Sequence, residues 1–103
     1  MQPFVYAEDV DRIDFEDEQW VDIKRRMSYG DIDKLTINEV KTLQKGGTSI
    51  PLLLLNIKAW SFTDRAGKPA PVTRKNIEML NLSLVTRLLE EITKRNPFGA
   101  GKT

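Results

Sequence analysis

Residues 81–96 read NLSLVTRLLEEITKRN and carry the clearest helical pattern in the chain. Their apolar side chains recur every three or four positions, the spacing that places them on one face of an α-helix. These residues are Leu82, Val85, Leu88, Leu89 and Ile92. Asn81 is a favourable N-cap, and Lys94 with Arg95 suits the negative end of the helix dipole. The stretch therefore predicts an amphipathic helix that closes a core and ends at Asn96.

Another helix is expected earlier in the chain, over residues 51–60. Pro51 suits the first turn of a helix, and residues 52–60 read LLLLNIKAW. Four consecutive leucines cover every side of a helix, so this helix is either central or gives one side to a partner. We expect Leu55, like Leu88 in the last helix, to be buried.

Two further helices are indicated by their caps. Ser28, with Asp31 three residues later, resembles a capping box and predicts a helix over residues 29–45. Thr73 is placed to cap a short helix over residues 74–80.

The segments between and before the helices predict extended structure. Asp64 and Gly67 favour a turn, and their flanks favour a small β-hairpin near residues 62–72. Residues 15–24 predict a short strand, because Val21 and Ile23 alternate with Trp20, Asp22 and Lys24 in a run rich in β-branched and aromatic residues. Residues 1–14 are acidic and are expected to form an arm or an edge strand.

Together these elements predict a mainly α fold, with three to four helices, a short N-terminal strand and the small hairpin. We expect one domain at this length of 103 residues. An acidic N-terminal arm covers residues 1–14, a compact helical domain covers residues 15–96, and a flexible Gly-rich tail covers residues 97–103.

Composition excludes several chemistries. The chain has no His and no Cys, which rules out Cys/His zinc sites, disulfides and a Ser-His-Asp triad. Seven acids and one base lie in residues 1–18, whereas the remainder has fifteen bases and eight acids. Those bases are scattered, so nucleic-acid binding is not expected. Without a signal peptide or a long apolar run, the chain is expected to be cytoplasmic and to have no membrane partner.

The motifs that suggest a catalytic or cofactor site fail on inspection. Residues 96–103 resemble a phosphate-binding loop. However, Asn96 occupies the position where the motif requires its first Gly, and no helix follows Thr103. Two Asp-x-Asp pairs, which begin at Asp9 and Asp31, lack the later ligands of a calcium loop. The acids lie in polar runs, at caps or on helix surfaces. We therefore expect no catalytic residue, no cofactor, no metal site and no enzyme activity.

The order of short motifs resembles a family of small proteins of long-tailed bacteriophages and prophages, the tail assembly chaperones or tail proteins. The matching motifs are WVDI at 20–23, SYGD at 28–31, LLLL at 52–55, AWSFTD at 59–64, GKP at 67–69, TRKNI at 73–77 and NLS at 81–83. The W-x-F-x-D turn, followed by Gly-Lys-Pro and a Thr-capped helix, is the most specific part. The resemblance covers residues 20–96.

The resemblance implies a non-enzymatic viral protein of virion morphogenesis that binds and solubilises the tape-measure protein in the host cytoplasm. It also implies that the chain is absent from the mature virion and that tail-tube subunits are further partners, while homo-oligomerisation stays open. Candidate positions for this protein–protein interaction are Leu52, Leu53, Trp60 and Phe62, because aromatic anchors are over-represented among binding hot spots. For Trp60 and Phe62, packing in the core and in the turn is the favoured alternative explanation.

Two alternative functions remain at this stage. One is a structural tail or head–tail connector component that stays in the particle. The other is a small regulatory or nucleic-acid-binding domain, which needs a basic helix face.

Overall fold

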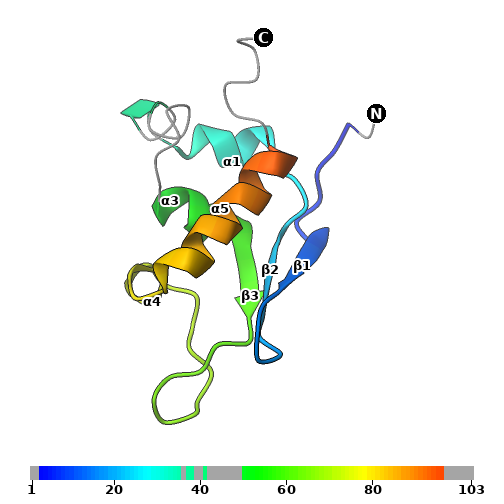
Figure 1. Ribbon diagram of the computed structural model, residues 1–103. Helices are drawn as coiled ribbons and strands as arrows, with labels where there is room; N and C mark the ends of the chain where they lie inside the picture. Colours follow the sequence, from blue (N-terminus) through cyan, green and yellow to red (C-terminus); the bar gives the residue numbers. More distant parts are fainter. Residues whose placement is uncertain (1–2, 36, 39–40, 42–49, 97–103) are drawn as a thin grey trace.

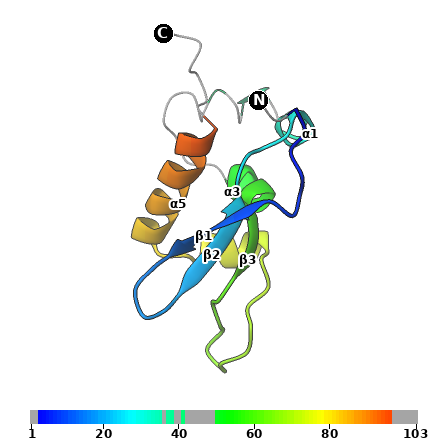
Figure 2. The same ribbon diagram turned by 90° about the vertical axis from the view of Figure 1, so that its right-hand side faces the viewer.

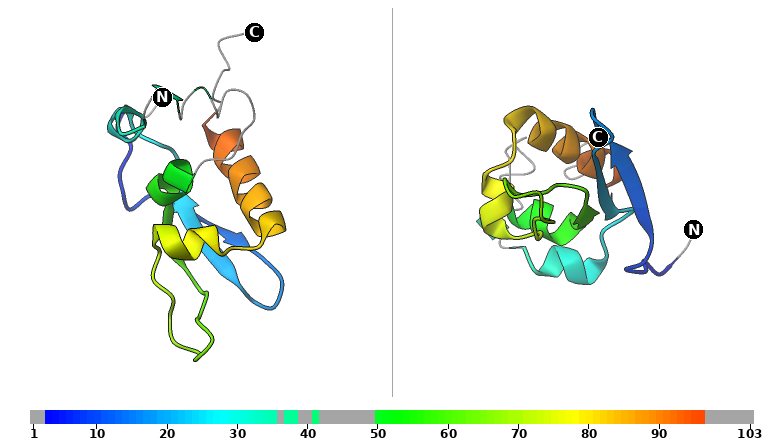
Figure 3. Two further views of the ribbon diagram at one scale, coloured as in Figure 1. Left: turned by 90° about the vertical axis from the view of Figure 1, so that its left-hand side faces the viewer. Right: turned by 90° about the horizontal axis from the view of Figure 1, so that it is seen from below.

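The computed structural model describes residues 3–35, 37–38, 41 and 50–96. The elements, in chain order, are β1 (Val10–Asp14), β2 (Trp20–Lys24), α1 (Tyr29–Asp33), α3 (Ile50–Asn56), β3 (Ile57–Trp60), α4 (Arg74–Glu78) and α5 (Leu82–Arg95). The strands form an antiparallel sheet in the order β1-β2-β3, with the helices gathered towards one of its faces (Figures 1 and 3). The predicted mainly α fold is therefore wrong, since the described residues combine four helices with a three-stranded sheet.

The first hairpin explains part of this difference. Val10–Asp14 belongs to residues 1–14, which were expected to form an arm or an edge strand, and it takes the second form: it pairs along its full length with β2 and forms an edge of the sheet. The turn between the strands places Asp17 and Glu18 at a φ of 59° each. Such turns usually carry Asn or Gly at these positions, so the sequence lacked the signal that normally reveals a hairpin.

The second difference is the end of the leucine-rich helix. The sequence predicted a helix to Trp60, but α3 ends at Asn56 and the chain continues directly as β3 beside β2. Asn56 is fully buried, and its side-chain amide donates to the carbonyl of Leu52 at 2.9 Å, which satisfies an acceptor in the last turn. A strand of four residues is too short for its alternation to stand out against a helical run.

The helix predicted over residues 29–45 begins as expected. The capping box is confirmed, because the Ser28 hydroxyl accepts from the Asp31 amide and the Asp31 carboxylate accepts from the Ser28 amide. However, α1 ends at Asp33, and Lys34 and Leu35 lie in a turn and a bend. Residues 37, 38 and 41 are helical, while the predicted end of this helix at residue 45 lies outside the described residues.

The core lies between the inner face of the sheet and the helices. Its fully buried apolar side chains come from β2, α3 and α5, namely Val21, Ile23, Leu52, Leu88 and Ile92. Burial is confirmed for Leu88, whereas Leu55 packs against the core but is only partly buried. The predicted helix after Asn81 is present as α5, and Thr73 caps α4.

The predicted turn near residues 62–72 is also present, as a projecting loop (Figure 2). Thr63 and Pro69 form an isolated antiparallel bridge. One Asp64 carboxylate oxygen accepts from the amides of Ala66 at 2.8 Å and Lys68 at 3.0 Å. Gly67 takes a φ of 80°, a conformation that strains any residue with a Cβ.

Two further expectations concern the C-terminal tail and membrane-spanning helices. The Gly-rich tail predicted for residues 97–103 lies outside the described residues. Within the described part of the chain, no helix has the length and apolar character needed to cross a membrane.

Candidate partner-binding groove

Side-chain hydrogen bonds cap the N-termini of α4 and α5, two helices that border an apolar groove. The Thr73 hydroxyl accepts from the Asn76 amide at 3.2 Å, and the Asn76 side chain donates to the carbonyl of Pro71 at 2.8 Å. Asn81 accepts from the amide of Ser83 at 2.8 Å and starts α5 three residues after α4 ends. Because this connection is short, the end of α4 lies close to the start of α5. Helix α3 packs against both of them.

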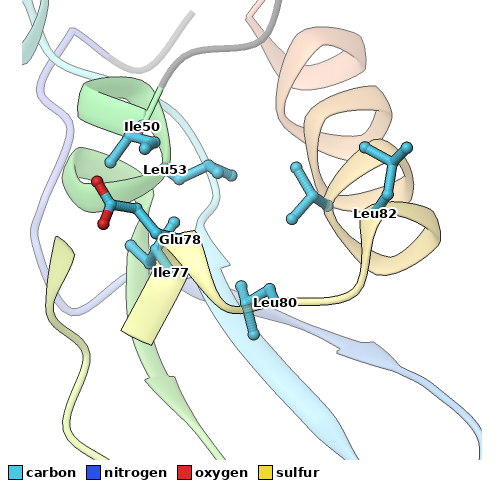
Figure 4. Close-up of a pocket in the computed structure, with 7 residues that line it drawn as sticks. Ile50, Leu53, Ile77, Glu78, Leu80 and Leu82 are labelled. Carbon is cyan, nitrogen blue, oxygen red and sulfur yellow. The ribbon is translucent and has the colours of Figure 1, made fainter. Parts of the chain in front are cut away.

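An apolar groove of about 190 Å³ lies where these three helices meet (Figure 4). It is lined by Ile50, Leu53, Ile77, Glu78, Leu80, Leu82 and Val85. Leu53 and Ile77 are nearly fully buried and form its floor, whereas Leu82 at the rim is 73% exposed. We call this feature the α3–α5 groove.

The groove continues the apolar stripe of α5. Leu88 and Ile92, in the later turns, are fully buried against the core. Val85 and Leu82 belong to the same face, but they lie at the start of the helix, where they line the groove. The stripe therefore extends past the core it closes, and its first turn presents apolar surface to solvent.

Glu78 is the charged member of the groove lining. Its carboxylate lies 3.4 Å from the guanidinium of Arg74, and both side chains are at least half exposed. Exposed pairs of this kind contribute little to stability, so Glu78 is free to exchange Arg74 for a basic side chain of a partner.

Of the four residues proposed as partner anchors, Leu53 lines the groove, whereas Leu52, Trp60 and Phe62 do not. Leu52 is fully buried in the core, and Leu53 is part of the groove floor. Trp60 is also buried, donates its indole N–H to the carbonyl of Ala70 at 2.6 Å, and packs 5.1 Å from the ring of Phe62. Leu53 and Leu52 thus support the α3 wall, while the aromatic pair anchors the projecting loop.

The sequence placed Leu82 and Val85 on the core-closing face of their helix; Val85 packs against the core, whereas Leu82 is exposed at the groove rim. One signal was present: Leu82 is the first residue of its helix, six positions before Leu88, the first buried residue of α5. Whether the side chain of such a residue is buried depends on where the neighbouring helix packs. The spacing of apolar residues along one helix does not predict that position.

Charged side chains at the far end of α5 are engaged in pairs. Arg95 bonds Asp11 of β1 at 2.9 Å and Glu91 at 2.7 Å. The hydrogen bonds from Arg95 hold the pKa of Asp11 and of Glu91 below their ordinary values. This cluster clamps the edge strand to α5.

The second clamp is less exposed. Lys24 lies 2.7 Å from Asp31, with side-chain exposures of 14% and 8%. Burial by itself raises the pKa of Asp31, but the bonds from Lys24 and the Ser28 amide outweigh it and hold the pKa below its ordinary value. Among the residues that the structure describes, no group of three or more acids is placed to hold a metal ion.

Comparisons with protein-family models, with curated proteins and with solved structures found no match to this chain. The resemblance to the tail assembly chaperones, which rests on the short motifs of residues 20–96, therefore stays a prediction.

Proposed function

We propose that this protein is a tail assembly chaperone of a long-tailed bacteriophage or prophage. It binds the tape-measure protein without covalent chemistry and keeps it soluble until tail-tube subunits assemble around it. The observation that carries the proposal is the α3–α5 groove, an apolar surface that starts at the exposed Leu82 and ends on the buried Leu53. The motif resemblance supplies the identity of the partner.

The groove suits an amphipathic helix. A tape-measure protein is long and helical, with apolar stripes that aggregate when bare, and such stripes are covered by helix-in-groove contact. A row of apolar side chains at i and i+3 or i+4 fits between α4 and α5 over the floor of Leu53 and Ile77. A basic residue beside that row pairs with Glu78.

The role also predicts where the protein is found. The chaperone acts in the host cytoplasm and leaves before the tail is complete. Mass spectrometry of purified particles therefore detects tube subunits but not this chain. A stoichiometric amount in the particle supports instead a structural tail or connector component.

Co-expression with the tape-measure protein tests the proposal directly. The native chain raises the soluble fraction of the tape-measure protein, and Leu82→Ser removes most of that effect because it replaces the exposed apolar rim. Met79→Ser is the matched control, since Met79 is 71% exposed against 73% for Leu82 but does not line the groove. If the tape-measure protein stays insoluble with the native chain, or if both variants behave alike, the proposal is wrong.

A further inference from the structure

The charge of the α3–α5 groove comes from a single side chain of α4. Helix α3 contains no charged residue, and α5 contains none before Arg87. The Arg87 guanidinium is directed to the hairpin, where it donates to the carbonyl of Asp14 at 2.8 Å and lies 4.8 Å from the centre of the Phe15 ring. Among the described residues, the groove is thus an apolar surface with one negative charge, that of Glu78.

This charge is placed asymmetrically. Glu78 and Leu82 lie on opposite sides of the groove, with Glu78 towards α3 and Leu82 on the first turn of α5 (Figure 4). A ligand in the groove therefore meets a carboxylate on one side and only apolar side chains on the other. Such a lining discriminates between ligands by the position of their charge as well as by its sign.

The volume of the groove limits how much of a partner it can hold. It measures about 190 Å³, and an apolar cavity of about 150 Å³ holds a benzene molecule. Its floor is closed, because Leu53 and Ile77 are nearly fully buried. The groove therefore receives one large apolar side chain, of the size of Phe or Leu, while neighbouring side chains of the partner contact the exposed rim at Leu82.

In the free chain, Arg74 occupies the place of a partner's cation. Its Nε lies 3.4 Å from a carboxylate oxygen of Glu78, four positions later in α4, and the Arg74 side chain is 62% exposed. An exposed pair at this spacing contributes little to stability, so exchanging Arg74 for a Lys or Arg of a partner costs little. An acidic side chain at the same place is repelled by Glu78 and is disfavoured.

We infer that the α3–α5 groove selects an amphipathic helix in which a Lys or Arg lies one turn away from a large apolar side chain. The apolar side chain enters between Leu53 and Leu82, and the cation displaces Arg74 from Glu78. The inference deepens the proposed function, on which it rests for the identity of the protein that contributes this helix. Of the apolar stripes of a tape-measure protein, the groove then binds those that a base flanks.

Two synthetic helical peptides test the inference on the full chain without any tape-measure protein. Both carry the same row of leucines on an Ala-rich helix, and they differ only one turn from the central leucine, where one has Lys and the other has Glu. In fluorescence polarisation at low salt, the native chain binds the Lys peptide about fivefold more tightly than the Glu peptide. Glu78→Gln binds both peptides equally, and Glu78→Lys prefers the Glu peptide.

A second pair of variants tests the exchange of Arg74. Arg74→Ala frees Glu78 and binds the Lys peptide about twofold more tightly than the native chain does. Lys75→Ala is the matched control, since it removes the same charge from an exposed position of α4 outside the groove lining, and it binds less tightly than Arg74→Ala. All the replaced side chains are exposed, so the fold is retained.

The inference is overturned if the native chain binds neither peptide or both alike, or if Glu78→Lys keeps the preference for the Lys peptide. It is equally overturned if Arg74→Ala and Lys75→Ala bind the Lys peptide alike. The proposed function fails on a different result, a tape-measure protein that stays insoluble with the native chain, so the two failures are distinguishable.

Discussion

Replacing Asp31 by Asn probes the least exposed ion pair of the described residues. One carboxylate oxygen of Asp31 lies 2.7 Å from the Lys24 ammonium, and the other accepts from the Ser28 amide at 3.0 Å. Asn keeps an acceptor for Ser28 but turns its NH₂ towards Lys24, which leaves that ammonium without its carboxylate in a site where its side chain is only 14% exposed.

The magnitude follows from these contacts. A hydrogen bond to a charged group contributes about 1.5–3 kcal/mol. Breaking one side of a buried pair costs about 3–5 kcal/mol, an upper limit here because Lys24 keeps some contact with water. We therefore expect Asp31→Asn to lower the free energy of unfolding by about 2–4 kcal/mol at pH 7. For a domain of this size that lowers Tm by roughly 10–25 °C.

The pH dependence gives an independent check. Because the pKa of Asp31 is held below its unfolded value of about 3.9, its stabilising effect is complete above that value. It is lost as pH falls through the lower pKa of the folded state. Urea unfolding followed by circular dichroism at pH 7 and pH 3 should show a smaller acid loss in Asp31→Asn than in the native chain.

A companion variant separates the ion pair from general damage. Lys24→Met/Asp31→Asn leaves no unpaired ammonium, so its free energy of unfolding should exceed that of Asp31→Asn alone. The reasoning is refuted if Asp31→Asn lies within about 0.5 kcal/mol of the native chain, or if the double variant is less stable than either single one.

Two further predictions concern the core and the projecting loop. Leu88→Ala should cost about 3–5 kcal/mol in urea unfolding because Leu88 is fully buried, and Leu55→Ala should cost less because that side chain is partly exposed. An equal loss of unfolding free energy in the two variants would contradict the difference in burial between Leu88 and Leu55. Asp64→Ala removes the acceptor for two loop amides and should cost about 1 kcal/mol. Amide exchange at Ala66 and Lys68 should rise, and unchanged exchange would show that the Asp64 turn does not hold the loop.

Local signals in the sequence were enough to find the helix ends that carry caps. Ser28, Thr73 and Asn81 each accept from the backbone amide that their position in the sequence predicts. The turn at Asp64 and Gly67 is also local, because both residues act on amides or torsions within a few positions. Such features depend on neighbours in the chain and are visible in one sequence.

The sheet depends on partners that are distant in the chain. β3 pairs with β2 nearly forty residues away, so nothing adjacent to Ile57 marks the change from helix to strand. For β1, the acidic composition left an arm and an edge strand equally open, and the choice is made by distant contacts: Ile13 is buried in the core and Asp11 is paired with Arg95 and Arg25. The surface of the groove was missed for the same reason: the exposure of Leu82 is set by how α3 and α4 meet α5.

The chain contains no Cys, so a single engineered thiol can report on the groove without ambiguity. An environment-sensitive fluorophore attached to Leu82→Cys lies at the groove rim, and the same label on Met79→Cys lies outside the lining. On titration with the tape-measure protein, we predict a saturable blue shift for the label at 82 and little change for the label at 79. No shift at 82, or equal shifts at both positions, would contradict the claim that the α3–α5 groove is the binding surface.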